Sequence, residues 1–296
     1  MSQAHPETPQ RVADLARRDW TTKLADCYAK LDPSTPLDYR ALATLLASEW
    51  SSDPPKRIGL AGGQGAGKST LSRLIEAACA SFGVRVCVLG LDDFYFSRAH
   101  RKSLAEEIHP LLETRGPPGT HDISRCRDAI SQLLLSGEVE LPVFDKGLDD
   151  LAGVRRVRGP FDLILLEGWC VGALSVDEAS LAEPINPLEA SQDGEGRWRR
   201  YVNRRLAGAY AATWDELEDI VYLRVPNLEA VRRWRLQQER SRPEDRRIGS
   251  EAVDAFVQHF ERVTLSMMET LAEHANPRVD LAEDHSISSV VFRSSD

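Results

Sequence analysis

The sequence predicts an α/β fold with a mainly parallel sheet, and three observations support this prediction. Apolar segments typical of strands alternate with segments of helical periodicity along much of the 296-residue chain. Residues 161–166 are apolar at every position except Asp162, as expected for a strand that is buried on both faces of a sheet. A glycine-rich stretch at residues 62–67 separates an apolar segment from an amphipathic one, which indicates a strand, a tight loop and a helix in succession.

Composition and charge exclude several other classes of protein. Hydrophobic residues make up 42% and charged residues 28% of the chain, which supplies a core and excludes a wholly disordered chain. No apolar run approaches about 18 residues, and residues 1–18 lack the apolar core of a signal peptide, so a cytoplasmic protein without a membrane span is expected. The five cysteines form no C-x-x-C pair, which predicts reduced thiols and no cysteine-based zinc site. A net charge of −9 argues against a protein that coats nucleic acid.

The elements can be predicted in chain order. Residues 1–55 are expected to form a helical extension packed on the core, because Tyr39, Leu42 and Leu46 recur at helical spacing. Residues 56–296 would form the main domain. Strands are expected at residues 57–61, 84–91, 161–166, 220–225, 279–281 and 287–292. Helices are expected at residues 68–78, 123–135, 228–238 and 252–271, and loops at residues 97–120 and 175–196.

Residues 62–69 read Gly-Gly-Gln-Gly-Ala-Gly-Lys-Ser and match the phosphate-binding pattern G-x-x-x-x-G-K-[ST] at every fixed position. Glycines let the backbone curl so that its N–H groups converge on phosphate oxygens, and the following helix adds its positive N-terminal dipole. Lys68 is expected to neutralise the β and γ phosphates and Ser69 to ligate Mg²⁺. The expected nucleotide contacts are Gly62, Gly63, Gln64, Gly65, Ala66, Gly67, Lys68, Ser69 and Thr70. The motif predicts a bound nucleotide and leaves the reaction open.

Two of the expected strands end in acidic residues, at residues 92–93 and at Glu167. Ligands of an open α/β sheet bind beyond the carboxyl ends of its strands, where a carboxylate can hold Mg²⁺ or accept a proton. Because successive strand residues point in opposite directions, only one of Asp92 and Asp93 is expected to face the phosphates. The alternatives are a solvated acid at Glu167 and a turn-capping role for one of the pair.

These motifs resemble a known superfamily. The phosphate-binding loop, the Leu-Asp-Asp-Phe-Tyr segment at 91–95 and Glu-Gly at 167–168 are similar to the phosphoribulokinase, uridine kinase and pantothenate kinase superfamily. Residues 109–122, His-Pro-Leu-Leu-Glu-Thr-Arg-Gly-Pro-Pro-Gly-Thr-His-Asp, with Glu-Gly-Trp-Cys at 167–170, resemble its D-glycerate 3-kinase branch. The resemblance covers roughly residues 55–290. It implies a P-loop NTPase sandwich of three layers with an arginine-rich lid at about residues 228–250.

The resemblance also implies catalytic roles. Asp92 would be the general base, and Glu167 would approach Mg²⁺ or the acceptor hydroxyl. Ser69, Asp92 and Glu167 are the expected metal ligands. Asp93 stands where the relatives have a small residue, so the choice of acid between Asp92 and Asp93 stays open.

An acceptor pocket is implied at Tyr95, Arg115 and His121, with Asp93 beside them. The guanidinium of Arg115 suits a carboxylate, and its alternative is a surface ion pair with Glu113 or Glu107. The alternative for His121 is a structural histidine at a helix start. Two further residues belong to this region: Asp122 is an equally good helix cap, and Lys146 could reach the acceptor.

Seven arginines follow Pro226, at positions 232, 233, 235, 240, 242, 246 and 247. In the related kinases a lid supplies arginines to the transferring phosphate, and Arg235 is the expected catalytic one here. The alternative is a solvated helix face. A nucleic-acid patch is disfavoured because Glu239, Glu244 and Asp245 dilute the positive charge.

Taken together, the residues and the resemblance predict an ATP- and Mg²⁺-dependent kinase of a small hydroxy acid, D-glycerate, which would give 3-phosphoglycerate. One alternative changes the acceptor to pantothenate, a nucleoside or a sugar phosphate. Another is a non-kinase P-loop NTPase that acts through a protein partner, although the absence of an Asn-Lys-x-Asp motif disfavours a GTPase switch. The expected partner is a small molecule, with no nucleic acid and no membrane, and the sequence does not indicate an oligomeric state.

Overall fold

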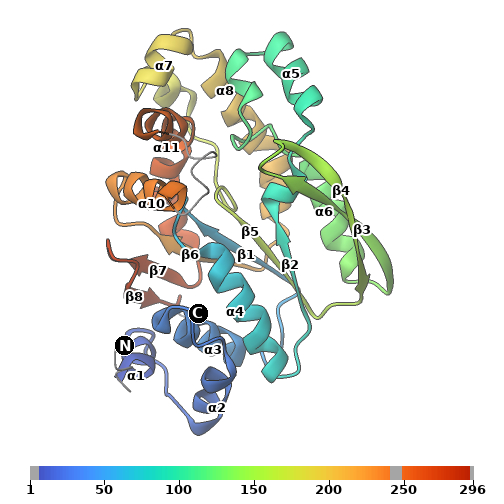
Figure 1. Cartoon of the computed structure of the whole chain (residues 1–296), viewed down its shortest axis with the longest axis vertical. Coiled ribbons are helices and arrows are strands. Elements are labelled where there is room, and N and C mark those ends of the chain that lie inside the picture. Colours follow the sequence, from blue (N-terminus) through green and yellow to red (C-terminus); the bar gives the residue numbers. More distant parts are fainter. Residues whose placement is uncertain (1–6, 241–248, 294–296) are drawn as a thin grey trace.

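The computed structural model describes residues 7–240 and 249–293, and it is a three-layer α/β sandwich (Figure 1). The central sheet has the strand order β2-β5-β1-β6-β7-β8, with five parallel strands and an antiparallel β8 at one edge. Its strands are β1 Arg57–Gly62, β2 Val86–Gly90, β5 Leu163–Gly168, β6 Asp219–Arg224, β7 Arg278–Leu281 and β8 Ile287–Val291. The predicted fold class is confirmed.

Each face of the sheet carries its own apolar core. On β5, Leu163 and Leu165 point into one core, whereas Ile164 and Leu166 point into the other, as the alternation of strand side chains requires. The first core lies beneath α4 (Lys68–Ser81) and α10 (Leu228–Arg240), and the second lies beneath α6 (Ile123–Leu133) and α11 (Ser250–His274). A strand buried on both faces therefore explains the continuous apolar run in the sequence.

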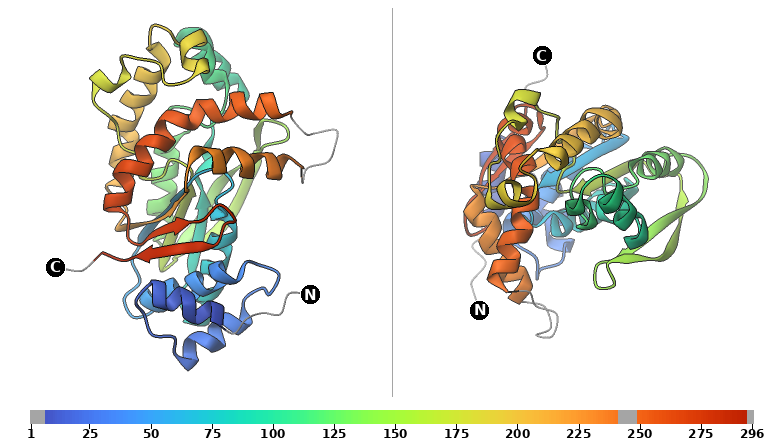
Figure 2. Two further views of the ribbon diagram at one scale, coloured as in Figure 1. Left: turned by 90° about the vertical axis from the view of Figure 1, so that its left-hand side faces the viewer. Right: turned by 90° about the horizontal axis from the view of Figure 1, so that it is seen from above.

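From residue 7 onward, the N-terminal extension contains three helices: α1 (Glu7–Leu15), α2 (Thr22–Lys30) and α3 (Leu37–Glu49). They lie at one end of the molecule, next to α4 and β8 (Figures 1 and 2). Every residue of α3 from Tyr39 to Ala47 is buried, and the apolar ones belong to the same core as α4 and β1. The extension thus shares a continuous core with the sheet.

Three segments differ from the sequence prediction. Residues 97–120 were expected to be a loop, but they contain α5 (Arg98–Glu107) and a 3₁₀ helix, Pro110–Glu113. Ser97 caps α5 by accepting a hydrogen bond from the His100 N–H at 3.2 Å. The only buried residue of α5 is Arg101, so the helix has no apolar stripe that the sequence could reveal.

A hairpin formed by β3 (Gly137–Asp145) and β4 (Asp150–Gly159) was not predicted either. It lies outside the central sheet, and most of β4 is exposed, so its sequence lacks the apolar alternation of a half-buried strand. The turn between its strands carries Lys146 and Asp149 toward the carboxyl ends of the central strands.

Residues 175–196 were expected to be a loop and no element was predicted for residues 197–214, but both segments contain helices. They form a 3₁₀ helix (Glu178–Leu181), α7 (Pro187–Gln192), α8 (Arg197–Arg205), a π-helical turn (Leu206–Tyr210) and α9 (Ala211–Trp214). Buried ion pairs join this region: Arg199 pairs with Asp193 at 3.1 Å, and Arg262 pairs with Glu189 at 2.6 Å. In α7 the buried Glu189 interrupts the apolar spacing, whereas Trp198, Val202 and Leu206 are buried at the four-residue spacing of a helix.

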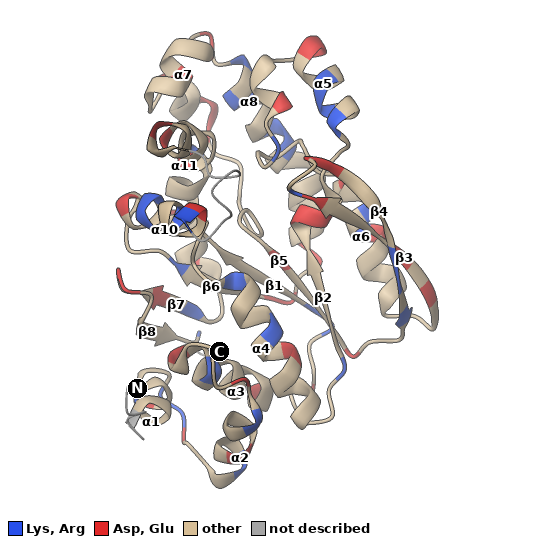
Figure 3. Cartoon of the chain, in the orientation of Figure 1, with Lys and Arg blue, Asp and Glu red and all other residues tan. Residues whose placement is uncertain are grey.

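All five cysteines are buried free thiols. Over the described residues, no helix is both long enough and apolar enough to cross a bilayer. Figure 3 shows basic residues on several elements, including α5, α8 and α10, with acidic residues among them.

We expect Leu42→Ala to lower the free energy of unfolding by about 2–5 kcal/mol, because Leu42 is 0% exposed in the core between the extension and α4, and truncation leaves a cavity. Urea denaturation measures this change. Leu135→Ala is the control, since Leu135 is 65% exposed and its truncation should alter stability by less than about 0.5 kcal/mol. Equal effects of the two variants would contradict the shared core.

Candidate active site

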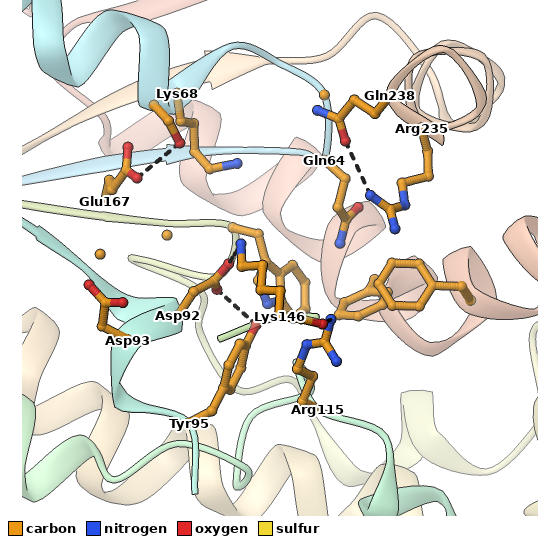
Figure 4. Close-up of a pocket in the computed structure, with 17 residues that line it drawn as sticks. Gln64, Lys68, Asp92, Asp93, Tyr95, Arg115, Lys146, Glu167, Arg235 and Gln238 are labelled. Carbon is orange, nitrogen blue, oxygen red and sulfur yellow. Dashed lines mark hydrogen bonds and ion pairs between the residues drawn. The ribbon is translucent and has the colours of Figure 1, made fainter. Parts of the chain in front are cut away.

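A cavity of about 320 Å³ opens at the carboxyl ends of β1, β2 and β5 (Figure 4). Its lining residues are Gln64, Gly65, Lys68, Ser69, Gly90, Asp92, Asp93, Tyr95, Arg115, Lys146, Glu167, Gly168, Trp169, Arg235, Gln238, Phe256 and Phe260. The sheet order brings these residues together, since β5 lies between β1 and β2. This edge of the sheet is where an open α/β fold binds its ligands.

The phosphate-binding loop forms one wall. Gly65 and Gly67 have φ values of +80° and +81°, a left-handed conformation that favours glycine. The Lys68 ammonium donates hydrogen bonds to the carbonyl oxygens of Gly62 at 2.7 Å and Gly63 at 3.0 Å. Burial lowers the pKa of Lys68, and the nearby carboxylates of Asp92 and Glu167 oppose this shift.

Not every residue of the loop reaches the cavity. Four of the expected nucleotide contacts line it: Gln64, Gly65, Lys68 and Ser69. The other five do not: Gly62, Gly63, Ala66, Gly67 and Thr70. Residues of a phosphate-binding loop can still act through backbone N–H groups, which need no side chain in the cavity.

The donor set beside the loop suits Mg²⁺. The Ser69 hydroxyl donates to Glu167 Oε1 at 3.0 Å, and the Ser72 hydroxyl donates to Glu167 Oε2 at 2.9 Å. Hydroxyl and carboxylate oxygens are the hard ligands that Mg²⁺ prefers, usually one or two from the protein together with substrate phosphates. Among the described residues, no group of three or more His, Cys, Asp or Glu side chains is arranged to hold a metal ion.

Asp92 and Asp93 lie in a 3₁₀ helix, Leu91–Phe94, rather than in a strand. The prediction that only one of them faces the site was therefore based on the wrong geometry, because strand alternation does not apply and both carboxylates line the cavity. They face different neighbours. Asp93 Oδ2 and Glu167 Oε1 both approach Gly90, at 3.7 and 3.9 Å from the position of an added Cβ atom.

Asp92 is tied to two side chains. Its Oδ2 accepts a hydrogen bond from Lys146 Nζ at 2.6 Å, and its Oδ1 accepts one from the Tyr95 hydroxyl at 2.8 Å. Burial alone would raise the pKa of Asp92, but the charge and hydrogen bond of Lys146 and the hydrogen bond of Tyr95 lower it to about 2. Burial raises the pKa of Asp93 instead.

The two predicted acceptor residues Arg115 and His121 have different environments. Arg115 lines the cavity, where it forms an ion pair with Asp149 from the β3–β4 turn, so neither Glu113 nor Glu107 is its partner. His121 does not line the cavity. Its ring is fully buried and stacks on Tyr95, with ring centroids 4.5 Å apart.

A hydrogen bond to Tyr210 fixes the His121 ring. Its Nδ1 lies 2.7 Å from the hydroxyl oxygen of Tyr210, which also accepts the Gly119 N–H at 2.8 Å. Burial lowers the pKa of His121 to about 4, although Asp92 opposes the shift. The neighbouring Asp122 caps α6 by accepting a hydrogen bond from the Arg125 N–H at 3.1 Å. His121 is therefore a buried support for Tyr95, and Asp122 is a helix cap.

Arg235 lines the cavity from α10, and Figure 4 shows its guanidinium directed toward Gln64. It pairs with Glu239 at 2.6 Å, bonds Gln238 at 3.3 Å and lies over the Phe256 ring at 4.9 Å. Two neighbouring arginines form ion pairs elsewhere, Arg232 with Glu229 and Glu261, and Arg233 with Glu283. The predicted lid residues Arg242, Glu244, Asp245, Arg246 and Arg247 lie outside the described residues.

Several lining residues were not predicted for the site. Trp169 directly follows the Glu-Gly pair, and its Nε1–H donates to the Gly116 carbonyl at 3.1 Å. Phe256 and Phe260 lie four residues apart on α11, a spacing that equally fits a core-facing helix. The pairing of Lys146 with Asp92 depends on a hairpin that the sequence does not reveal.

The buried His121 predicts a pH dependence of stability. In the unfolded chain it binds a proton near its ordinary pKa of 6.5, whereas the folded protein binds it only near 4. Stability should therefore fall as the pH drops through this window, by about 2–3 kcal/mol between about pH 7 and pH 4.5 for this group. Urea unfolding of the wild type and of His121→Asn checks this: the variant should lose less stability over the same range, and parallel losses would contradict it.

Comparisons with known proteins give a consistent picture. No family model matches the chain. The uncharacterized kinase mug58 of Schizosaccharomyces pombe is 29% identical over 240 residues, which cover 75% of this chain and 85% of that protein. The chloroplastic D-glycerate 3-kinase of Arabidopsis thaliana is 30% identical over 224 residues, which cover 70% of this chain and 46% of that protein, so the match spans about half of the plant enzyme.

A solved structure has the same fold. The D-glycerate 3-kinase of Cryptococcus neoformans superposes with a TM-score of 0.69 and 21% identity, and the match covers 98% of this chain and 100% of that one. The sequence relatives are kinases, the fold is shared with a kinase, and the phosphate-binding loop stands at the carboxyl end of β1 as in an NTP-using enzyme. The chain is therefore similar in sequence to proteins named as kinases, a plant D-glycerate 3-kinase among them, and it shares the fold of a solved D-glycerate 3-kinase.

Proposed function

We propose that the enzyme transfers the γ-phosphoryl group of ATP to the 3-hydroxyl of D-glycerate. One observation supports this most directly: a single cavity is lined by the nucleotide residues Lys68 and Ser69 and by a carboxylate with two cations, Asp92, Arg115 and Lys146. A hydroxy acid needs such a set, a carboxylate for its hydroxyl and a cation for its own carboxylate. The identity with the plant D-glycerate 3-kinase adds support.

ATP would bind along the loop with Lys68 on its phosphates and with Arg235 at the transferring group. Mg²⁺, when bound, supplies positive charge to the phosphates. Ser69 and Glu167 would hold it, since they already share a hydrogen bond of 3.0 Å. Asp92 is the third expected ligand, but both of its oxygens bond Lys146 and Tyr95, which favours a role on the acceptor side.

Asp92 would orient the acceptor hydroxyl and accept its proton. A carboxylate whose pKa is about 2 is a weak base, but it stays ionised at every working pH. Phosphoryl transfer makes modest demands on base strength, because the transition state is loose and the reaction depends mainly on positioning and charge. Tyr95 would fix the orientation of this carboxylate through its hydroxyl.

The carboxylate of the acceptor would bind Lys146, with Arg115 nearby. Lys146 is 58% exposed and sits on the hairpin turn, so its ammonium can be shared between Asp92 and an incoming anion. Arg115 is held in place by Asp149 of the same turn, which Arg101 also contacts at 3.0 Å. The turn would thus act as a preformed anion clamp. We further propose a cytoplasmic location, which the five free thiols favour.

Two other functions fit the same cavity: phosphorylation of a different alcohol, and nucleotide hydrolysis coupled to a protein partner. ADP release is measured with ATP and Mg²⁺ against D-glycerate, L-glycerate, pantothenate, uridine and ribulose 5-phosphate. We expect D-glycerate alone to stimulate, and Asp92→Asn to reduce this rate by at least about a hundredfold. Stimulation by another compound would replace the substrate, and hydrolysis indifferent to the whole panel would support the second alternative.

Lys146→Met should raise KM for D-glycerate by about 10- to 100-fold while KM for ATP stays near the wild-type value, because a charge-assisted hydrogen bond to the acceptor is lost. Lys146→Arg should recover part of the loss. Lys102→Met on exposed α5 is the matched control and should change neither constant. An unchanged KM for D-glycerate in Lys146→Met would restrict Lys146 to its contact with Asp92.

A further inference from the structure

The N-terminal extension touches the phosphate-binding loop through Tyr39. This side chain on α3 is 2% exposed, and its hydroxyl donates a hydrogen bond to the Ala66 carbonyl oxygen at 2.7 Å. Its ring also closes on the next residue, because a Cβ atom added at Gly67 would lie 2.5 Å from Tyr39 Cε2. The loop is therefore in van der Waals and hydrogen-bond contact with a helix outside the main domain.

The carbonyl of Gly65, the preceding residue of the loop, is bound by a side chain near the C-terminus. His285, in the turn between β7 and β8, places its Nε2 3.0 Å from the Gly65 carbonyl oxygen. Its ring stacks on Trp234 of α10 with centroids 4.0 Å apart, and the Trp234 indole donates to the Glu283 carbonyl at 2.9 Å. Two successive carbonyls of the loop thus accept hydrogen bonds from side chains that line no part of the cavity.

Because the peptide group is planar and trans, a contact to the Ala66 carbonyl also fixes the direction of the Gly67 N–H. The C=O of one residue and the N–H of the next point in opposite directions across the peptide plane. The hydroxyl of Tyr39 holds the Ala66 carbonyl on the outer side of the loop, which turns the Gly67 N–H toward its inner side. Convergent N–H groups on that inner side are what bind phosphate oxygens.

The position of Tyr39 is itself fixed. Asp38, the preceding residue, accepts a hydrogen bond from the Ile287 N–H of β8 at 2.7 Å and forms an ion pair with Arg11 of α1. Arg11 also donates to the Ile287 carbonyl at 2.8 Å. The extension is thereby joined to the edge of the sheet beside the residue that reaches the loop.

We propose that Tyr39 is a positioning residue for nucleotide binding: through its hydrogen bond to Ala66 it presets the Gly67 N–H for a phosphate oxygen before the nucleotide arrives. The N-terminal extension is then part of the nucleotide site, although none of its side chains from residue 8 onward lines the cavity. A loop that is preset loses less conformational freedom on binding, so the contribution appears as affinity. This role is independent of the acceptor.

Tyr39→Phe tests the proposal, because it removes one oxygen atom and keeps the ring. We expect the Kd for ADP, measured by calorimetry on the full chain, and KM for ATP to rise about tenfold, as for the loss of one hydrogen bond that orders the site. The acceptor KM and kcat at saturating ATP should stay within about twofold of wild type. Tyr28→Phe is the matched control within the extension, and its ADP affinity should be unchanged.

Three results would overturn the proposal. Unchanged ADP affinity in Tyr39→Phe would show that the hydroxyl serves stability alone. An equal loss in Tyr28→Phe would assign the effect to the extension as a whole. A fall in kcat at saturating ATP without any change in nucleotide affinity would also contradict a role in phosphate binding. Since the ADP measurement needs no acceptor, its outcome stays separate from the test of D-glycerate.

Discussion

The curl of the phosphate-binding loop is the constraint on which the site depends. Its two left-handed positions, Gly65 and Gly67, need glycine for backbone reasons, and packing adds a second reason, because an added Cβ atom would lie 2.6 Å from Trp234 and 2.5 Å from Tyr39. Lys68 ties the start of the loop to its own helix through the carbonyls of residues 62 and 63. The glycines of this motif are usually explained by phosphate contacts. Here they are also required because Trp234 and Tyr39 leave no room for a side chain at these two positions.

Sheet topology then brings distant acids to this loop. The register pairs Ala61 with Gly168 and Gly90 with Glu167, so the chain leaves β1, β2 and β5 at one common level. Glu167 consequently meets Ser69, although the two are separated by almost a hundred residues in the chain. The acids at 92 and 93 follow β2 directly, in a 3₁₀ helix that turns both carboxylates toward the cavity. If another strand lay between β2 and β5, Asp92 and Asp93 would be too far from Glu167 to line the same cavity, although the sequence of each segment would be unchanged.

The sequence predicted the elements that are held by packed apolar faces. It failed to predict most elements that are held by buried polar side chains. The six strands of the central sheet, the loop and helices such as α10 and α11 were predictable because their apolar faces pack on the sheet. Helix α5 was not, since Arg101 is its one buried residue, and the short α7 depends on the pair of Glu189 with Arg262. Helix α8 was missed although its buried Trp198 and Val202 have helical spacing. Several residues that the motifs singled out line the cavity, such as Lys68, Asp92 and Glu167. The pairing of Lys146 with Asp92 was not predicted, because Lys146 lies on a hairpin that the sequence does not reveal.

Charge explains why such a cavity can exist in a protein with a net charge of −9. Three of its four cations are already matched by acids of the chain: Lys146 by Asp92, Arg115 by Asp149 and Arg235 by Glu239. The fourth, Lys68, is hydrogen-bonded to backbone carbonyls of the loop. A partly buried charge without a partner would be costly, so the folded protein gives each of these cations an acid or a set of carbonyl oxygens. An anionic ligand must then compete for these partners rather than meet bare positive charge. Binding would then exchange one ion pair for another. Ligands whose anionic groups reach the cations now paired with Asp92 and Asp149 would be favoured, and ligands that leave either carboxylate unpaired would bind less tightly.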